Sequence, residues 1–411
     1  MPAHDPLKMI QKRQERIQNA IDLKEPDRVP MMGFAGDVVA SYAGFTNHEV
    51  HYDFDKARQA AIKYLKDFPS EMSLAGLWGI NNYVLAIAFA DFPDLAQKLS
   101  TITGPIHDIL KDKNTRFPGR ELSDNSSSQF IGGTYMQPDE YDEYTADPIK
   151  FSYKKILPRI SENIEHLNSP KAMATVAQMG MEIARQENDI KAMFEDLIQL
   201  GFTPPSMGYG YAPLDYIGDY LRDIPNLILD LRKYPDKVKA AAEATVEPII
   251  KVAMASKTMG SPFAFFPLHL NEYLSPKLYK EFYWPTLKKI IIRLLDEGIK
   301  SHVFFEGCHE AHLETILELP RGWGIAAFEK TDVRKAKKML AGHTCVSGGL
   351  KSSLVIGGTP EENDLYVKEL LDEVKYGGGF ILSPDVLTLP RDIPIENLKA
   401  VYQAVEKYGY Y

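Results

Sequence analysis

Residues 301–312 read SHVFFEGCHEAH. In this stretch an apolar run from Val303 to Phe305 leads directly into Glu306 and Gly307. A short apolar run of this kind predicts a buried strand. In α/β barrels the residues just past such strands form the functional site. A buried carboxylate needs a partner or a metal, so we predict that Glu306 has a functional role, with a structural ion pair as the alternative.

The same pattern, an apolar run followed by polar residues, repeats through the C-terminal 150 residues. Apolar runs followed by helical patterns occur at 263–268, 303–306, 325–328, 344–347 and 380–383. Strands that alternate with helices of this length predict repeated βα units around a parallel sheet. We therefore predict an α/β fold, a (β/α)8 barrel. Neither Gly-x-Gly-x-x-Gly after a first strand nor a Walker-type Gly-Lys-Ser/Thr occurs, which excludes the usual dinucleotide and P-loop sites.

Upstream of this region the pattern is less regular. Residues 1–25 form an N-terminal extension with an amphipathic helix at about 6–23, and the run RVPMMGF at 28–34 suits a first buried strand. Residues 172–180 and 203–209 are interpreted as short strands or strand-to-loop passages. A polar, Ser- and Gly-rich stretch predicts an irregular insertion at about 112–150. We expect one domain over residues 1–411.

Composition restricts the functional class. The chain has 411 residues, 45% of them apolar and 25% charged, with a net charge of −9 that is spread rather than concentrated. This argues against nucleic-acid binding. No apolar run approaches the length of a membrane span, and the N-terminus lacks the apolar core of a signal peptide. With two cysteines and no disulfide framework, the expected location is the reducing cytoplasm.

Residues of metal-binding type follow Glu306 directly. Cys308, His309 and His312 lie within five residues, and the two histidines share a face if a helix has already begun. This spacing is not a specific zinc signature, so histidines on a solvated first helical turn are the alternative. Cys345 lies inside a predicted strand and is interpreted as a small buried apolar residue.

Two further strand ends carry polar residues. His269 ends the run FAFFPLH, and Asp385 follows the last strand in LSPD. Imidazole with carboxylates suits zinc, and an open coordination position would let the metal act as a Lewis acid. We therefore predict Glu306, His269 and Asp385 as catalytic residues and as zinc ligands, with Cys308 as a further ligand. A hydrogen-bonded structural histidine and an Asx turn at Asp385 are the alternatives.

Substrate contacts are expected from the same end of the predicted barrel. Phe34 ends the first predicted strand, Asp37 follows it, and Tyr209 ends the 203–209 run. Aromatic residues in this chain are mostly core, although a subset can line a pocket for a flat substrate. We therefore predict Phe34, Asp37 and Tyr209 as substrate-binding residues.

Taken together, several segments in this order resemble the uroporphyrinogen decarboxylase superfamily along nearly the whole chain. They are EPDRVP, EFYWPTLKKI, FFEG, FEKTDVRKAKKMLAGHTCVSGGL, GTPEE and GGGFILSPD followed by PIENLKAVYQAV. The resemblance implies a TIM barrel whose site lies at the C-terminal mouth. True decarboxylases of the family carry an arginine-rich element after the first strand, whereas MGFAGDVVASYAG at 31–44 has no arginine. Recognition of an acidic tetrapyrrole needs fixed positive charge.

The other branch of the superfamily comprises corrinoid-dependent methyltransferases. Its thiol-specific members hold zinc with a His-x-Cys pair at the FFEG corner, where this chain has Phe304 and Glu306. The aromatic-rich middle and the FFEG and FPGR stretches are more similar to methyltransferase components of anaerobic O-demethylases. This resemblance implies methyl transfer from a methoxylated aromatic to the cobalamin of a partner corrinoid protein. A decarboxylase and a non-catalytic binding barrel are the alternatives, and the oligomeric state, a homodimer included, stays open.

Overall fold

The structure is a computed structural model that describes residues 5–76, 78–204, 208–258, 260, 261, 263–386 and 388–411. The chain divides into two compact units. The first unit comprises Met1–Leu77, Asn188–Pro205 and Val303–Tyr411, and the second comprises Trp78–Glu187 and Ser206–His302. None of the described helices is long and apolar enough to cross a membrane.

Strands in the first unit pair in parallel, as the predicted βα repeats require. Strand β10 (Cys345–Leu350) lies between β9 (Gly324–Phe328) and β11 (Phe380–Pro384), with Val346 opposite Ala326 on one side and Phe380 on the other. Every residue of β9 and β11 is buried. Strands buried on both faces are typical of parallel sheets covered by helices. The sequence prediction of these three strands is confirmed.

The predicted first strand at 28–34 lies beside the last strand of the repeat. Met31 makes a parallel bridge to Leu382, and Met32 makes another to Met72. Pro30 has no N–H, so it contributes only its carbonyl, which accepts from the Leu382 amide. The first unit therefore contains two further strand positions beyond β11, at 31–32 and 72. First-to-last pairing of this kind is what closes a barrel.

A buried carboxylate fixes the start of this first strand. Glu71 accepts from Arg28 Nη2 at 2.6 Å, from Arg16 Nη1 at 2.8 Å and from the Met31 amide at 2.8 Å. The Glu71 side chain is 1% exposed, so it needs these charged partners to offset its desolvation. The EPDRVP segment therefore has a structural role in which Arg28 ties the first strand to Glu71.

A shorter parallel pair follows the first strand. In strand β1 (Ala35–Gly36), Gly36 lies opposite Leu389 of strand β12 (Thr388–Leu389). Gly36 has φ +89°, and a Cβ there would lie 2.6 Å from the Thr388 Cβ. Both the left-handed backbone and the close approach require glycine.

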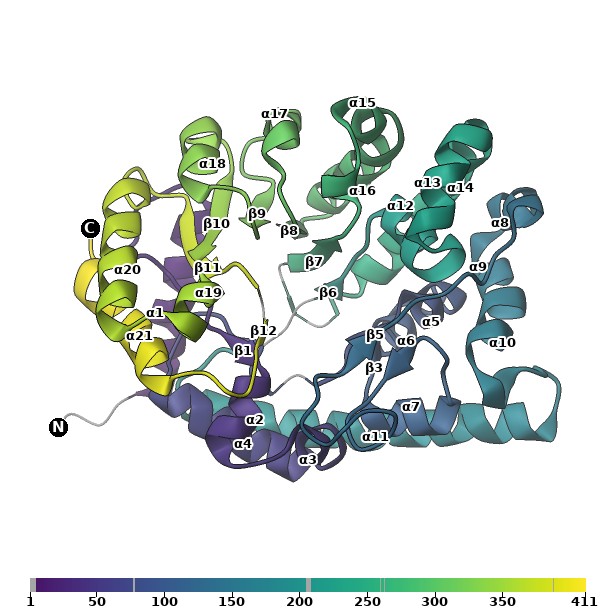
Figure 1. The fold of residues 1–411 in the computed structure, drawn as a ribbon, viewed down its shortest axis with the longest axis horizontal. Helices are drawn as coiled ribbons and strands as arrows, with labels where there is room; N and C mark the ends of the chain where they lie inside the picture. The colour runs from purple at the N-terminus through teal and green to yellow at the C-terminus, as the bar shows by residue number, and fades with distance from the viewer. Residues whose placement is uncertain (1–4, 77, 205–207, 259, 262, 387) are drawn as a thin grey trace. The chain divides into compact units, whose positions relative to one another are not determined.

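Helices of the first unit begin at side-chain caps. Thr359 forms a capping box with Glu362 at the start of α20 (Pro360–Val374), which packs against α21 (Ile395–Tyr408) in Figure 1. The remaining helices of this unit are α1 (Pro6–Ile21), α2 (Asp37–Ala43), α3 (Asn47–Tyr52), α4 (Phe54–Asp67), η7 (Glu310–His312), α17 (Leu313–Ile316), α18 (Val333–Leu340) and α19 (Ser352–Gly357).

The second unit contains the parallel pair β6 (Gly208–Tyr209) and β7 (Phe263–Leu268), in which Tyr209 lies opposite Phe265. Its other strands are the pairs β2 (Ile80–Asn81) with β3 (Thr101–Ile102) and β4 (Thr115–Arg116) with β5 (Gln129–Phe130). Its helices are α5 (Tyr83–Ala88), α6 (Pro93–Lys98), α7 (Gly104–Leu110), η1 (Pro138–Glu140), α8 (Tyr141–Ala146), α9 (Pro148–Phe151), η2 (Ser152–Ile156), α10 (Leu157–Ile160), η3 (Glu162–Ile164), α12 (Pro213–Tyr216), η4 (Ile217–Arg222), α13 (Ile224–Lys233), α14 (Pro235–Met254), η5 (Asn271–Tyr273), α15 (Pro276–Leu278), η6 (Tyr279–Tyr283) and α16 (Trp284–Asp296).

Two elements have residues in both units: α11 (Pro170–Gln199) and β8 (Lys300–Phe305). Strands β6 to β11 belong to one six-stranded sheet, which confirms the α/β class. The strand predicted at 172–180 is wrong, because these residues lie inside the long helix α11 (Figure 1). Of the run predicted at 203–209, residues 205–207 lie outside the described residues, and 208–209 form β6.

Candidate functional site

Residue His269 directly follows strand β7, as the sequence predicts, and it lies against two carboxylates from the segment after β6. Its Nδ1 is 2.6 Å from Asp219 Oδ2. The same carboxylate oxygen accepts from the Tyr211 hydroxyl at 2.6 Å. The Asp219 side chain is 6% exposed and that of His269 32% exposed. The pair therefore combines a buried carboxylate with an imidazole that reaches the surface.

Behind this pair lies a second carboxylate, Asp215, which is 0% exposed. Its Oδ1 accepts from the Leu270 amide at 2.9 Å, and its Oδ2 accepts from the His269 amide at 3.1 Å and from the Tyr283 hydroxyl at 2.5 Å. Burial raises the pKa of the Asp215 carboxyl well above its ordinary value. Asp215 thus anchors the backbone of the turn that carries His269.

The geometry assigns the protons of the pair. Because Nδ1 of His269 faces a carboxylate, this nitrogen carries a hydrogen, and the second ring nitrogen, Nε2, is the one that exchanges a proton with a reactant. A buried carboxylate behind an imidazole orients the ring and stabilises its charged form. The arrangement suits a general acid or base at the C-terminal end of a barrel strand.

Tyr209 lies one strand away in the same unit. It is half-buried, and its backbone amide donates to Gln97 Oε1 at 3.2 Å. Its ring meets the Phe265 ring edge-on at 6.3 Å, and burial raises the pKa of its hydroxyl. The structure thus brings the two sequence-predicted residues of this unit, His269 and Tyr209, to the ends of adjacent strands.

In the first unit, Glu306 directly follows β8 and is half-buried. The next residue, Gly307, donates its amide to Glu329 Oε2 at 2.6 Å, and the His309 amide donates to Thr331 Oγ1 at 2.7 Å. These bonds tie the turn after β8 to the turn after β9. The predicted position of Glu306 at a strand end is confirmed.

The histidines of this turn are not on a solvated helical surface, which corrects that alternative. His309 is 0% exposed and His312 3% exposed. The His309 ring packs 4.2 Å from the Phe305 ring, and burial lowers the pKa of His309 well below its ordinary value. Cys308, by contrast, is exposed. The two histidines therefore pack as core residues beneath the corner.

The remaining predicted residues of the first unit have different surroundings. Asp385 Oδ1 accepts from Ser352 N at 3.0 Å, Ser352 Oγ at 2.5 Å and Val386 N at 2.8 Å. These bonds link the end of β11 to the start of α19. Phe34 is 0% exposed, and Asp37 is the half-buried first residue of α2. Cys345 is fully buried as predicted.

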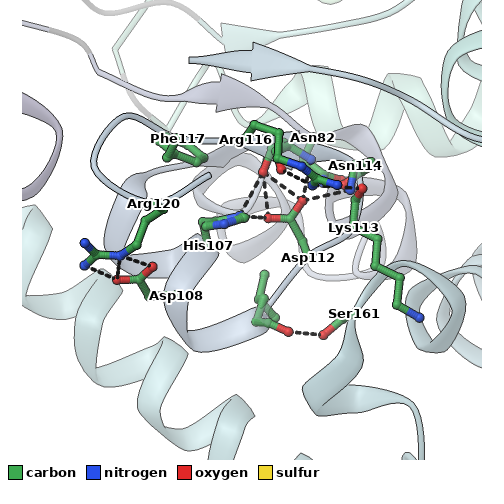
Figure 2. Close-up of polar contacts among 12 residues, drawn as sticks. Asn82, His107, Asp108, Asp112, Lys113, Asn114, Arg116, Phe117, Arg120 and Ser161 are labelled. Carbon is green, nitrogen blue, oxygen red and sulfur yellow. Dashed lines mark hydrogen bonds and ion pairs between the residues drawn. The ribbon is translucent and has the colours of Figure 1, made fainter. Parts of the chain in front are cut away.

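A second histidine–carboxylate cluster joins α7 to the predicted insertion (Figure 2). His107 Nδ1 is 2.5 Å from Asp112 Oδ2, and its Nε2 is 3.1 Å from Glu121 Oε1. Asp112 Oδ1 also accepts from the Thr115 amide at 2.8 Å. Both ring nitrogens face carboxylates, the buried Asp112 and the partly exposed Glu121, so this cluster holds the insertion to α7.

One pocket of the first unit, with a volume of about 450 Å³, is lined by residues that include Arg28, Asp67 and Tyr402. Arg28 precedes the first strand, so this pocket does not lie where barrel chemistry is expected.

The zinc prediction finds no ligand set among the described residues, where no three His, Cys, Asp or Glu side chains lie close enough together to hold a metal. Both oxygens of Asp215 and one oxygen of Asp385 already accept hydrogen bonds. The predicted ligands lie in different units, Glu306, Cys308 and Asp385 in the first and His269 in the second, so zinc binding stays a prediction, and the mechanism below uses only side chains of the chain itself.

Comparison with known proteins now gives the family. The model of the uroporphyrinogen decarboxylase (URO-D) family matches residues 148–408, more than half of the chain. The chain belongs to the URO-D family. No curated protein matches it. A solved methyltransferase from Methanosarcina mazei is similar in fold, with a TM-score of 0.61 and 14% identity over 96% of this chain and 98% of that one. The TIM-barrel prediction is confirmed, since the URO-D fold is such a barrel.

Sequence reasoning missed the carboxylates that support His269. Asp215 and Asp219 lie four residues apart in the segment YAPLDYIGDY at 211–220. Two acids at i and i+4 share a helical face, and in a tyrosine-rich, otherwise apolar segment this pairing was the available signal. The tyrosines were instead interpreted as core, and Tyr211 and Tyr216 are indeed buried.

Proposed function

We propose that this URO-D family protein is a corrinoid-dependent methyltransferase that demethylates methoxylated aromatics. The observation that carries the proposal is the His269–Asp219 pair at the end of β7, because it offers a positioned proton where barrel enzymes act. Family membership and the fold similarity to a methyltransferase support methyl transfer. The absence of arginine from residues 31–44 disfavours recognition of an acidic tetrapyrrole.

The chemistry requires a better leaving group than a bare phenolate. As the methyl carbon leaves the ether oxygen, the electron pair of the C–O bond stays on that oxygen, which must take up a proton. Reduced cobalt of a partner corrinoid protein supplies the nucleophile when it is bound. In this chain His269 Nε2 donates the proton, Asp219 holds the ring and Asp215 holds the backbone of the turn. Glu306 is the second candidate for the acid.

Absorption spectroscopy tests the proposal. The purified protein is mixed with a reduced corrinoid protein and a panel of methoxybenzenes, and conversion of cob(I)amide to methyl-cob(III)amide is followed. Methyl transfer from a methoxylated aromatic supports the proposal. An absence of conversion across a broad panel of methyl donors contradicts it.

The role of His269 as the acid is tested by varying the leaving group of the substrate. His269→Gln should slow transfer from methoxybenzene by about 10²- to 10⁴-fold. The loss should shrink for nitro-substituted methoxybenzenes, whose phenolates leave without full protonation. An equal loss for both substrates would assign His269 to structure or binding rather than to proton transfer.

A further inference from the structure

A buried histidine of the second unit, His302 on β8, has no part in the chemistry described so far. Its side chain is 3% exposed, and its Nδ1 has no hydrogen-bond partner among the described residues. A buried polar group without a partner costs free energy, so such a group in a folded protein calls for an explanation. Burial lowers the pKa of His302 to about 4. Its ring is therefore neutral at pH 7 and can both donate and accept a hydrogen bond.

The neighbours of His302 show which face of the sheet it lies on. Its ring meets the Phe265 ring edge-on at 5.3 Å, and the Phe265 ring meets the Tyr209 ring edge-on at 6.3 Å. A Cβ added at Gly208 would instead collide with Ser256, which lies just after helix α14. Successive residues of a strand point to opposite faces, so Tyr209 and its two ring partners share the face turned away from α14. In a barrel surrounded by helices, this is the inner face.

His269 lies on the same face, nearer the end of β7. It comes four residues after Phe265, and its Nδ1 is 3.0 Å from the hydroxyl of Tyr211, which comes two residues after Tyr209. At about 3.3 Å per residue, the levels of Phe265 and His269 are about 13 Å apart along the strand. This face therefore presents an imidazole at the strand end and, further in, an inner cluster that consists of Tyr209, Phe265 and His302.

The inner cluster is uncharged. Burial is the only cause of the pKa shifts of Tyr209 and His302, so no charged side chain of the described residues lies close enough to shift them. A carboxylate placed beside these residues would be desolvated without a counter-charge. A neutral hydroxyl, by contrast, can hydrogen-bond to the neutral imidazole while the aromatic ring that carries it packs against the rings of Tyr209 and Phe265.

We propose that His302 binds a ring hydroxyl para to the methoxy group, so that the site selects 4-methoxyphenols over methoxybenzoates. The inference rests on the proposed function, because it places the methoxy oxygen at His269. A benzene ring with two para oxygens, hydrogen-bonded at both ends, spans about 11 Å between the two bonded nitrogens. This length is close to the separation of the two levels. A hydroxyl ortho to the methoxy group would lie beside His269 and could not reach His302.

Calorimetry with the full chain tests the preference without any methyl transfer. The wild type should bind 4-methoxyphenol about tenfold tighter than methoxybenzene, 2-methoxyphenol or 4-methoxybenzoate. His302→Phe keeps an aromatic ring but loses the hydrogen bond, so it should bind 4-methoxyphenol and methoxybenzene equally. Its melting temperature should not fall, because replacing an unpartnered buried polar group with an apolar one of similar shape leaves no further group unsatisfied. His302→Leu is the second variant if the phenylalanine is not accommodated.

The outcomes separate this inference from the proposed function. A wild type that binds the four compounds equally, or a preference that survives in His302→Phe and His302→Leu, would overturn the inference. A preference lost in Tyr209→Phe but kept in both His302 variants would assign the hydroxyl to Tyr209 and would also overturn it. A wild type that shows the preference through His302 but forms no methyl-cob(III)amide with any methyl donor would contradict the proposed function alone.

Discussion

At the scale of single residues, the carboxylate behind His269 is the feature that most directly tests the site. Asp219→Asn keeps the size of the side chain but removes the charge that stabilises a protonated imidazole. Methyl transfer should fall by about 10²- to 10⁴-fold, measured as the rate of methyl-cob(III)amide formation. Tyr211→Phe removes a hydroxyl that contacts the same oxygen and His269 Nδ1 but leaves the carboxylate charge in place, so it should cause a smaller loss.

The second residue-scale prediction concerns Glu306. Glu306→Gln tests the second candidate for the acid: turnover should persist when His269 Nε2 donates the proton, and a loss as large as that of His269→Gln would assign the proton to Glu306 instead. The residue is only half-buried, so the melting temperature should shift by less than about 2 °C. The two quantities are measured on the same preparation. A folded, fully active variant would remove Glu306 from the site.

At the scale of elements, the insertion at 112–150 contains a titratable contact. Burial lowers the pKa of His107, but its bonds to Asp112 and Glu121 more than offset this, so the pKa is raised above the ordinary 6.5. A raised pKa in the folded state contributes stability that is complete below pH 6.5 and is lost as the pH rises through the folded value. The free energy of unfolding should therefore decrease as the pH rises above 6.5. His107→Gln, measured by denaturant unfolding across the same pH range, should flatten this dependence.

Elements were predictable where the pattern was strong. The strand runs at 263–268 and 325–328 lie where the sequence places them, because short apolar runs followed by helical patterns give a clear signal. The strand prediction at 172–180 was wrong because the outer face of α11 is apolar, which removes the contrast between a polar and an apolar face that marks a helix. Asp215 and Asp219 were not predicted as site residues because only tertiary contacts bring them to His269.

At the scale of the whole molecule, the family fold is shared by enzymes with different chemistry, so the substrate must be argued from the site. Residues 31–44 run through β1 into α2 without an arginine. We therefore predict that the protein releases no CO₂ from uroporphyrinogen. Chromatography of the porphyrins after oxidation measures this, with a true decarboxylase as the positive control. Appearance of decarboxylated products would restore the decarboxylase alternative.

The bridge between Met31 and Leu382 has a consequence for how the chain is made. Its two sides are separated by about 350 residues, and at a synthesis rate of 5–20 residues per second the first strand waits about 20–70 s for its partner. During this interval the apolar segment at 28–34 cannot be covered by β11. Pairing across such a sequence separation is slow to form. The nascent N-terminal segment is thus where a holdase chaperone would be expected to bind.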